Sequence, residues 1–170
     1  MDKDHRKPFQ VIDGGGTPAP PAHKRRLVAV MFTDIKGFSR MMGEDEERTV
    51  RLVERHREVV RRFFPRFEGE EHNTIGDAFV ALFESAVNAV KCGIAIQAAF
   101  REENAGKPRE EQVWIRVGVH LGDILIGEDG QIYGDTVNIA ARTEPMASTG
   151  GILVTEAVAA QVRAFLATSD

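Results

Sequence analysis

The sequence contains a single cysteine, Cys92, so the chain cannot form an internal disulfide bond. No run of apolar residues approaches the roughly 20 that a membrane-spanning helix needs, and no stretch has the apolar core of a signal peptide. Cysteines and histidines never occur at the spacing of a zinc site. These absences predict a cytoplasmic domain with no membrane contact.

Positive charge is not in excess. The 22 Lys and Arg residues are outnumbered by 26 Asp and Glu, which gives a formal net charge of -4. A protein of this balance has no global electrostatic reason to bind nucleic acid, and we expect no nucleic-acid partner. Its 170 residues, 42% of them hydrophobic, are enough for one domain with a single core.

The first 26 residues differ from the rest in composition. They contain three consecutive glycines, Gly14 to Gly16, and the proline-rich stretch TPAPPAHKRR, without apolar periodicity. This composition predicts a flexible N-terminal tail over residues 1–26. The folded domain is expected over residues 27–170.

The first half of the folded part predicts alternating strands and helices. LVAVMFTD is a buried strand that ends at Asp34, and residues 44–67 repeat apolar side chains at helical spacing. The strand AFVALF is followed by Ser85, the expected N-cap of a second helix. We predict that one face of this helix is apolar, with Ala86, Val90, Ile94 and Ala98.

In the second half, residues 113–127, VWIRVGVHLGDILIG, predict two strands with a turn near Gly122-Asp123. A short helix is expected to begin after Gly134 and to end near Met146. The segment GGILVTEAVAAQVRAFL predicts a last strand and a last helix. The first six elements then form a ferredoxin-like, split β-α-β core, an α+β fold with helices packed on a mainly antiparallel sheet.

This topology brings two carboxylates together. A right-handed crossover makes the first two strands parallel, and the third strand returns between them through the hairpin HNTIGDAFVALF. Asp34, at the end of the first strand, should therefore lie beside Asp77 in the hairpin turn. Taken singly, either residue could simply occupy a turn, where Asp is common.

Two adjacent carboxylates favour a divalent cation between them. Mg²⁺ is a hard ion, held in many proteins by one or two carboxylates and by substrate phosphates. The turn after Asp34 has backbone N–H groups near a glycine, which could bind a polyphosphate. Its residues are Lys36, Gly37, Phe38 and Ser39.

Four separated segments, FTDIKGFSRMMG, TIGDAFVALF, RVGVHLGDILIG and IYGDTVNIAARTEPMASTGGILVT, resemble the catalytic domain of class III adenylate and guanylate cyclases. The resemblance extends from about Arg26 to Arg163. It implies two Mg²⁺ or Mn²⁺ ions held by Asp34, Asp77 and the backbone carbonyl of Ile35. It also implies attack of the ribose 3′-hydroxyl on the α-phosphate, with pyrophosphate as leaving group.

TVNIAAR places Asn138 and Arg142 four residues apart, on one face of a helix. The resemblance implies that this Asn orients the ribose and this Arg stabilises the transition state. It also implies a homodimer, in which the carboxylates and the Asn–Arg pair of one active site come from different chains. Without the resemblance, Arg142 could equally be a surface partner of Glu144, and Asn138 a helix-start residue.

The residues expected at the base-recognition positions match no standard pattern. The resemblance assigns this role to Asn73 and Gln131, where adenylate cyclases usually have Lys and then Asp or Thr, and guanylate cyclases typically have Glu at the first position. An amide both donates and accepts hydrogen bonds, so it does not select a base. ATP, giving cyclic AMP, is the first expectation, with GTP or a pyrimidine triphosphate as alternatives.

The family usually continues past the last helix with two strands, one of which carries a triphosphate-binding Lys. This sequence ends at Asp170 without them, and Lys36 is a candidate substitute. A degenerate cyclase fold that binds nucleotide without turnover is therefore a second hypothesis. A polymerase-palm or diguanylate cyclase enzyme is a third, although the sequence has no GGDEF-like hairpin.

Overall fold

The computed structural model describes residues 24–75 and 77–167, except the side chains of residues 73–75 and 166–167. Six strands form one sheet in the order β2-β3-β1-β4-β5, with β6 paired to β4. The strands are β1 (Lys24–Ile35), β2 (Gly69–Ile75), β3 (Ala78–Phe83), β4 (Ile115–Ile126), β5 (Ile132–Tyr133) and β6 (Ile152–Val154). All pairs are antiparallel except β4 with β6.

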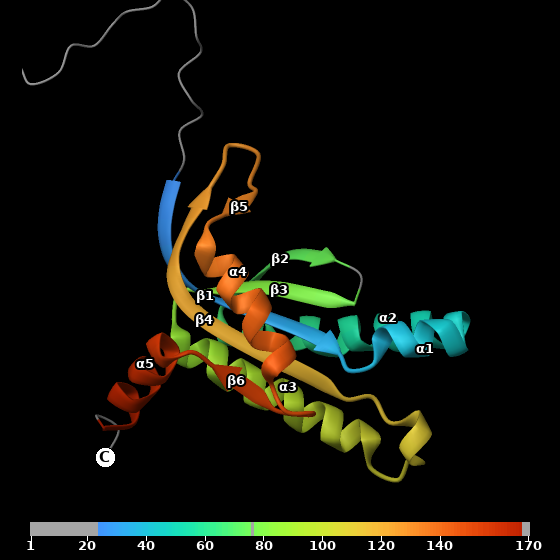
Figure 1. Cartoon of the computed structure of the whole chain (residues 1–170). Helices are drawn as coiled ribbons and strands as arrows, with labels where there is room; N and C mark the ends of the chain where they lie inside the picture. The colour runs from blue at the N-terminus through green and yellow to red at the C-terminus, as the bar shows by residue number, and fades with distance from the viewer. Residues whose placement is uncertain (1–23, 76, 168–170) are drawn as a thin grey trace, which may run out of the picture.

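Within the described residues, five α-helices and three 3₁₀ turns accompany these strands, and the last helix follows the last strand (Figure 1). The helices are α1 (Phe38–Glu44), α2 (Glu46–Phe63), α3 (Ala86–Asn104), α4 (Asp135–Thr143) and α5 (Glu156–Ala167). The 3₁₀ turns are η1 (Pro65–Phe67), η2 (Arg109–Glu111) and η3 (Glu144–Met146). The strand order confirms the predicted split β-α-β core, because β3 lies between β1 and β2.

The predicted turn at Gly122-Asp123 is wrong. β4 is one continuous strand that pairs with all of β1, from Lys24 opposite Ile126 to Ile35 opposite Ile115. A side chain at residue 122 would overlap with Thr136 of α4, because a Cβ built there lies 2.5 Å from the Thr136 hydroxyl oxygen. Glycine is present at this position for helix packing and not for a turn.

The start of β1 also differs from the prediction. The strand begins at Lys24, ahead of the expected Leu27, because residues 24–26 pair with residues 124–126 of the long β4 strand. The other residues of the predicted tail, 1–23, lie outside the described part of the chain.

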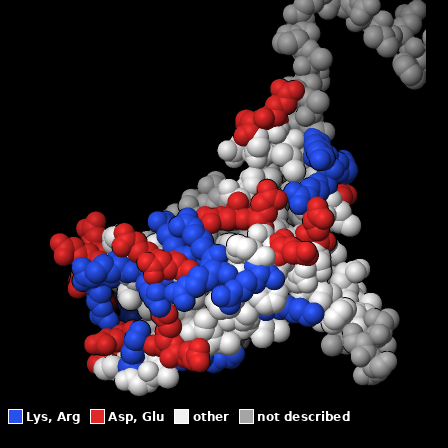
Figure 2. All heavy atoms as spheres, turned by 180° about the vertical axis from the view of Figure 1, so that it is seen from behind, with Lys and Arg blue, Asp and Glu red and all other residues white. Residues whose placement is uncertain are grey.

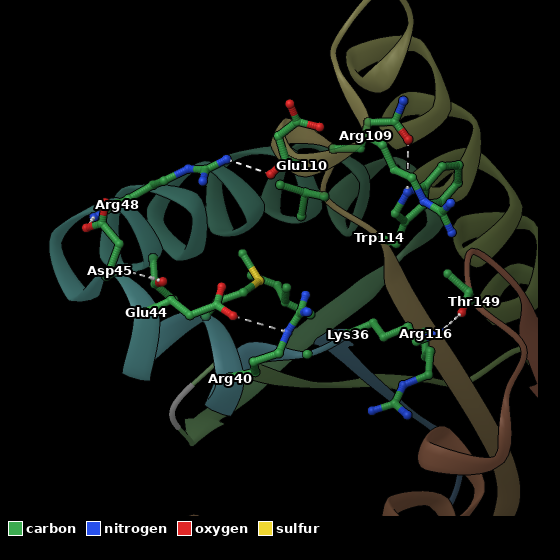
Figure 3. Close-up of a pocket in the computed structure, with 16 residues that line it drawn as sticks. Lys36, Arg40, Glu44, Asp45, Arg48, Arg109, Glu110, Trp114, Arg116 and Thr149 are labelled. Carbon is green, nitrogen blue, oxygen red and sulfur yellow. Dashed lines mark hydrogen bonds and ion pairs between the residues drawn. The ribbon is translucent and has the colours of Figure 1, made fainter.

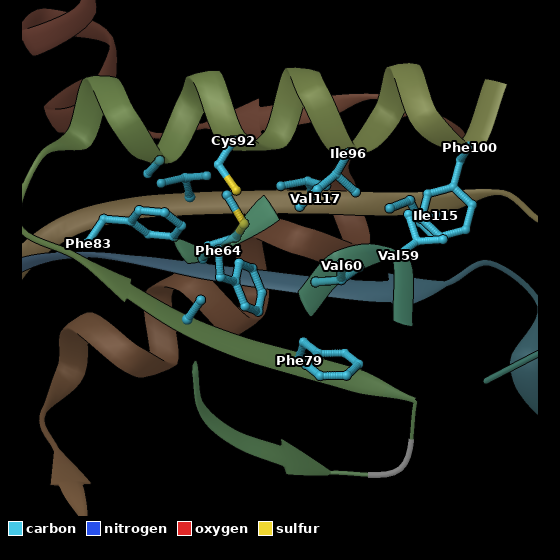
Figure 4. Close-up of a cluster of buried hydrophobic side chains, with 14 of the residues drawn as sticks. Val59, Val60, Phe64, Phe79, Phe83, Cys92, Ile96, Phe100, Ile115 and Val117 are labelled. Carbon is cyan, nitrogen blue, oxygen red and sulfur yellow. The ribbon is translucent and has the colours of Figure 1, made fainter. Parts of the chain in front are cut away.

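Helices cover both faces of the sheet, and alternate strand residues point to each side. On one face, α2 and α3 pack against Met31, Ile35 and Phe79 in the larger core (Figure 4). On the other face, α4 covers a smaller core that contains Val28 and Val30. Asp34 follows Val28 and Val30 in this alternation, so it lies on the α4 side of the sheet.

Helix boundaries follow local capping chemistry. The Asp45 side chain accepts a hydrogen bond from the backbone N–H of Arg48 (2.9 Å) and begins α2. Ser85 caps α3 in the same way through the N–H of Asn88 (3.1 Å), which confirms the predicted N-cap. The helix predicted over residues 44–67 ends at Phe63, just before Pro65.

The buried face of α3 matches the prediction only in its first half. Ala86 is buried and Val90 packs against the larger core, whereas Ile94 (54%) and Ala98 are exposed. Further along the helix, Ile96 and Phe100 lie in the core instead. Alanines and other small residues occur all around this helix, so its apolar pattern does not define one face.

Charged side chains of both signs alternate on the outer surface of α2 and α3 (Figure 2). Arg55 forms ion pairs with Glu58 of the same helix and with Glu103 of α3. Exposed pairs of this kind contribute about 0–1 kcal/mol each, so core packing is the larger contribution to holding these helices. Across residues 24–75 and 77–167, no helix has the length and apolar character to span a membrane.

Two glycines of β4 allow α4 and η3 to approach the sheet closely. A Cβ at Gly118 would lie 2.4 Å from the backbone N of Glu144, and Gly122 faces Thr136 as described. The Thr136 hydroxyl also donates to the carbonyl of Asp123 (2.6 Å). The position of α4 along β4 is therefore set at its start by the Thr136 side chain and at its end by the backbone of Glu144.

We predict that Gly118→Ala lowers the free energy of unfolding by roughly 1–3 kcal/mol, because the added methyl group meets backbone that cannot rotate away. Urea denaturation would measure the loss. Gly43→Ala is the matched control, since Gly43 lies in α1 with open space around its Cβ position and an ordinary φ. Equal stability of Gly118→Ala and wild type would contradict the close contact.

His56 of α2 is a buried polar residue in the larger core. Its Nε2 lies 3.4 Å from the hydroxyl of Thr33, and its ring packs edge-on against Phe79. Nδ1 has no hydrogen-bond partner within the described residues. Burial, with a smaller contribution from the Arg57 charge, lowers the pKa of His56 to about 3.

This shift predicts a pH-dependent stability. In the unfolded chain His56 takes up a proton near pH 6.5, whereas the folded protein resists it down to about pH 3. The free energy of unfolding should therefore decrease as the pH is lowered from about 6.5 to about 3, by up to roughly 1.4 kcal/mol per pH unit. His56→Leu should have a shallower slope in denaturation measured across this range. Identical slopes for the two proteins would exclude this role of His56.

Candidate active site

Asp34 and Asp77 meet at the end of β1, as the strand order predicts. The Asp77 Oδ2 accepts a hydrogen bond from the backbone N–H of Ile35 at 2.8 Å, which connects the β2–β3 turn to β1. Ile35 itself is 2% exposed and anchors this point in the larger core. The two carboxylates and the Ile35 backbone thus occupy one corner of the sheet.

Arg116 of β4 joins this corner, and the sequence analysis did not predict it. It stands opposite Asp34 in the β1–β4 ladder, and its Nη2 lies 3.3 Å from the Asp34 Oδ2. Its Nε lies 3.1 Å from Oε1 of Glu144, and its Nη1 donates to the carbonyl of Pro145 (3.2 Å). The sequence does mark Arg116 as unusual, because it is a charged residue between Ile115 and Val117 in an otherwise apolar stretch. This pattern could have indicated a functional residue.

The three carboxylates of the corner influence one another. Burial raises the pKa of Asp77, and the Asp34 charge adds to this, while the hydrogen bond from Ile35 acts in the opposite direction. Burial, together with the hydrogen bond and charge of Asp34, raises the pKa of Glu144 to about 8. Negative charge is therefore in excess here, despite Arg116.

A groove of about 1290 Å³ adjoins this corner (Figure 3). It is lined by residues from α1, α2, η2 and the start of β4. Five of its lining residues are cationic and three are acidic: Lys36, Arg40, Arg48, Arg109 and Arg116 against Glu44, Asp45 and Glu110. Lys36 donates to the hydroxyl of Thr149, which also lines the groove, so positive charge is in excess there. Such a surface can bind a polyanion next to the two carboxylates.

The residues predicted to bind phosphate have different surroundings. Gly37 has a φ of 78°, a left-handed conformation that favours glycine, and it precedes α1. Both Lys36 and Gly37 line the groove. Phe38 packs partly against the larger core, and Ser39 is exposed.

Asn138 and Arg142 lie on α4, and both are exposed. The Arg142 side chain is 71% exposed and reaches Asp135 only at 4.0 Å. The alternative in which Arg142 pairs with Glu144 is not what the structure has, because Glu144 points to Arg116. Among the described residues, neither Asn138 nor Arg142 has a recorded contact with Asp34 or Asp77, so one chain does not bring the two predicted groups together.

Of the two residues predicted to recognise the base, the structure describes only the side chain of Gln131, and it lies away from the carboxylate corner. Gln131 is exposed in the turn between β4 and β5, where its backbone N–H donates to Asp129 (3.0 Å). β5 pairs with the far end of β4, away from Asp34. The side chain of Asn73 lies outside the described part of the structure, although its backbone belongs to β2.

The apolar residues of α1 belong largely to the core and offer little surface to a second chain. Phe38 and Met41 pack against the larger cluster, and Met42 is half-buried. Met146 of η3 is 76% exposed, just beyond the end of α4. Exposed apolar surface is thus found next to Arg142.

The donor set at the corner suits a hard divalent cation. It provides two carboxylates and an excess of negative charge, and these are oxygen ligands. No group of three or more His, Cys, Asp or Glu within the described residues could hold a metal ion. The pair Asp34 and Asp77 suits Mg²⁺, which is usually bound by one or two carboxylates together with substrate phosphates.

Comparison with known proteins agrees with this geometry. Residues 21–169 match the family described as "Adenylate and Guanylate cyclase catalytic domain". The chain belongs to this cyclase family. The crystal structure titled "Adenylate/Guanylate Cyclase/Hydrolase" from Silicibacter pomeroyi is 33% identical, with a TM-score of 0.78 over 85% of this chain and 84% of that one.

Curated relatives of this cyclase domain are longer proteins. The Rhizobium meliloti (strain 1021) protein named "Putative adenylate cyclase 3" is 39% identical over 79% of this chain, and the match covers 23% of that protein. "Serine/threonine-protein kinase pkn2" of Myxococcus xanthus is 30% identical over 79% of this chain and 16% of its own length. The chain thus spans less than a quarter of these two relatives.

Proposed function

We propose that the chain is a nucleotidyl cyclase that converts a nucleoside triphosphate, with ATP as the first candidate, into a 3′,5′-cyclic nucleotide and pyrophosphate. The observation that carries the proposal is the meeting of Asp34 and Asp77 beside a cationic groove. Carboxylates for metal ions next to cations for phosphates are what phosphoryl transfer requires. Family membership narrows this chemistry to cyclisation.

Each residue of the site would have a separate role in this reaction. Two Mg²⁺ or Mn²⁺ ions held by Asp34, Asp77 and the Ile35 carbonyl would activate the 3′-hydroxyl and neutralise the triphosphate. Lys36 and Arg116 face the groove and would bind the phosphates that leave as pyrophosphate. Arg142 would stabilise charge on the α-phosphate, and Asn138 would orient the ribose.

A homodimer would complete the site. Asn138 and Arg142 are exposed on α4, and Met146 supplies apolar surface beside them. These groups are available to a second copy of the chain, whose Asp34 and Asp77 would face them. Because each chain carries both halves, a symmetric dimer would contain two equal sites.

The amide side chains of Asn73 and Gln131 do not determine which base the site selects. ATP is preferred because two of the curated relatives of this chain are named adenylate cyclases. GTP, CTP and UTP are the alternatives. Binding without turnover is the outcome expected of a degenerate cyclase. The cytoplasmic location stays a prediction.

The activity test is incubation of the purified chain with Mn²⁺ and each of the four triphosphates, followed by mass spectrometry of the products. We expect a cyclic nucleotide and pyrophosphate, and a loss of at least about a hundredfold in Asp34→Asn, which weakens the metal site. Asp123→Asn is the matched control, because Asp123 lies on the same sheet and pairs with Arg25 at the surface. No cyclic product from any triphosphate, at concentrations where the protein is dimeric, would refute the enzyme.

The shared site is tested by mixing two inactive variants. Asp34→Asn lacks the metal half and Arg142→Ala lacks the transition-state half, so each homodimer should be inactive. In an equal mixture that exchanges subunits, half of the dimers would contain one intact site, which gives about a quarter of wild-type activity. If the mixture stays inactive although native mass spectrometry detects mixed dimers, both halves must come from one chain.

A further inference from the structure

Arg116 contacts both oxygens of the carboxylate proposed to bind metal. Its Nη2 lies 3.3 Å from Oδ2 and 3.4 Å from Oδ1 of Asp34, and its Nε lies 3.4 Å from Oδ1. The two residues are partners in the β1–β4 register, so the sheet itself holds them together. In the free chain Asp34 is therefore already neutralised by a cation of the protein.

Two groups of η3 also contact the guanidinium. The carbonyl of Pro145 accepts a hydrogen bond from Nη1 at 3.2 Å, and Glu144, whose side chain is 7% exposed, forms an ion pair with Nε at 3.1 Å. Glu144 can come this close because Gly118 has no side chain where its backbone passes. Arg116 could thus release Asp34 and still keep two partners that belong to η3.

The hydrogen bonds from Arg116 to Asp34 are long. Their distances of 3.3–3.4 Å exceed the ~2.7–2.9 Å of strong charge-assisted hydrogen bonds. The Arg116 side chain keeps 23% of its surface exposed and lines the cationic groove together with Lys36. A polyanion in the groove would therefore offer Arg116 a new partner.

We propose that Arg116 is the internal counter-cation of Asp34, a positioning residue that must release this carboxylate before a divalent cation binds there. The inference rests on the proposed function. A divalent cation needs Asp34 oxygens that Arg116 occupies, and it repels the guanidinium, so the two compete. A phosphate in the groove that attracts Arg116 removes the competition. Metal and phosphate binding are then positively coupled through one side chain.

The test is Mn²⁺ binding to the nucleotide-free protein, measured by electron paramagnetic resonance. Arg116→Gln should bind Mn²⁺ about tenfold more tightly than wild type, a size typical of coupling between sites. At saturating Mn²⁺, calorimetry should show about tenfold weaker binding of pyrophosphate, the probe for the groove. A change of Arg116 that only disturbed the fold would weaken both.

Arg40→Gln is the matched control. Arg40 lines the same groove, but its partner is Glu44, so its removal takes away the same charge without touching Asp34. Its Mn²⁺ affinity should stay within about twofold of wild type, because an exposed charge is screened by solvent and salt. An equal gain in Arg40→Gln, or no gain in Arg116→Gln, would overturn the proposal.

Two further measurements keep the outcomes distinct. If Arg116→Gln fails to fold, Mg²⁺ titration of the wild type should shift the Arg116 Nε–H resonance, and an unmoved resonance would overturn the proposal. Asp34→Asn distinguishes a failure of the proposed metal site from a failure of the proposed role of Arg116. Unchanged Mn²⁺ affinity in that variant would reject the metal site of the proposed function. A loss there without a gain in Arg116→Gln would reject the role of Arg116 alone.

Discussion

The antiparallel ladder between β1 and β4 is the contact on which the rest of the structure depends. It runs the full 12 residues of both strands and places Asp34 opposite Arg116 at one end. A shift of one residue would turn Asp34 to the other face of the sheet, into the larger core. The same ladder presents Gly118 and Gly122 to α4. The register of this ladder thus determines both the contact between Asp34 and Arg116 and the position of α4, the helix that carries Asn138.

The corner also illustrates how a charged site is kept inside a stable fold. Three carboxylates and one guanidinium lie at the edge of two apolar clusters, with Ile35 and Phe32 as neighbours on the same strand. Burial of such groups is unfavourable unless each has partners. Arg116 provides them for Asp34 and Glu144, and the Ile35 N–H does so for Asp77. The excess negative charge that is left over is what a metal site needs.

The sequence analysis predicted that Asp34 and Asp77 meet because the order of strands in the sheet follows from the succession of strands and helices along the chain. It missed features that depend on what faces a residue across space. Gly122-Asp123 has the composition of a turn, and only the nearby Thr136 explains the glycine. Glu144 is a charged residue directly after α4 and yet lies buried. The face of α3 was misjudged because small residues surround the helix on all sides.

Gly118 and Gly122 also limit how α4 can move. At Gly118 the backbone of Glu144 rests directly on the strand, and at Gly122 the side chain of Thr136 does, so little space is left for α4 to slide or tilt. We therefore expect α4, η3 and β4 to move together. In the proposed homodimer, a change in the distance between Arg142 of one protomer and Asp34 of its partner would then arise from rotation of one whole domain against the other.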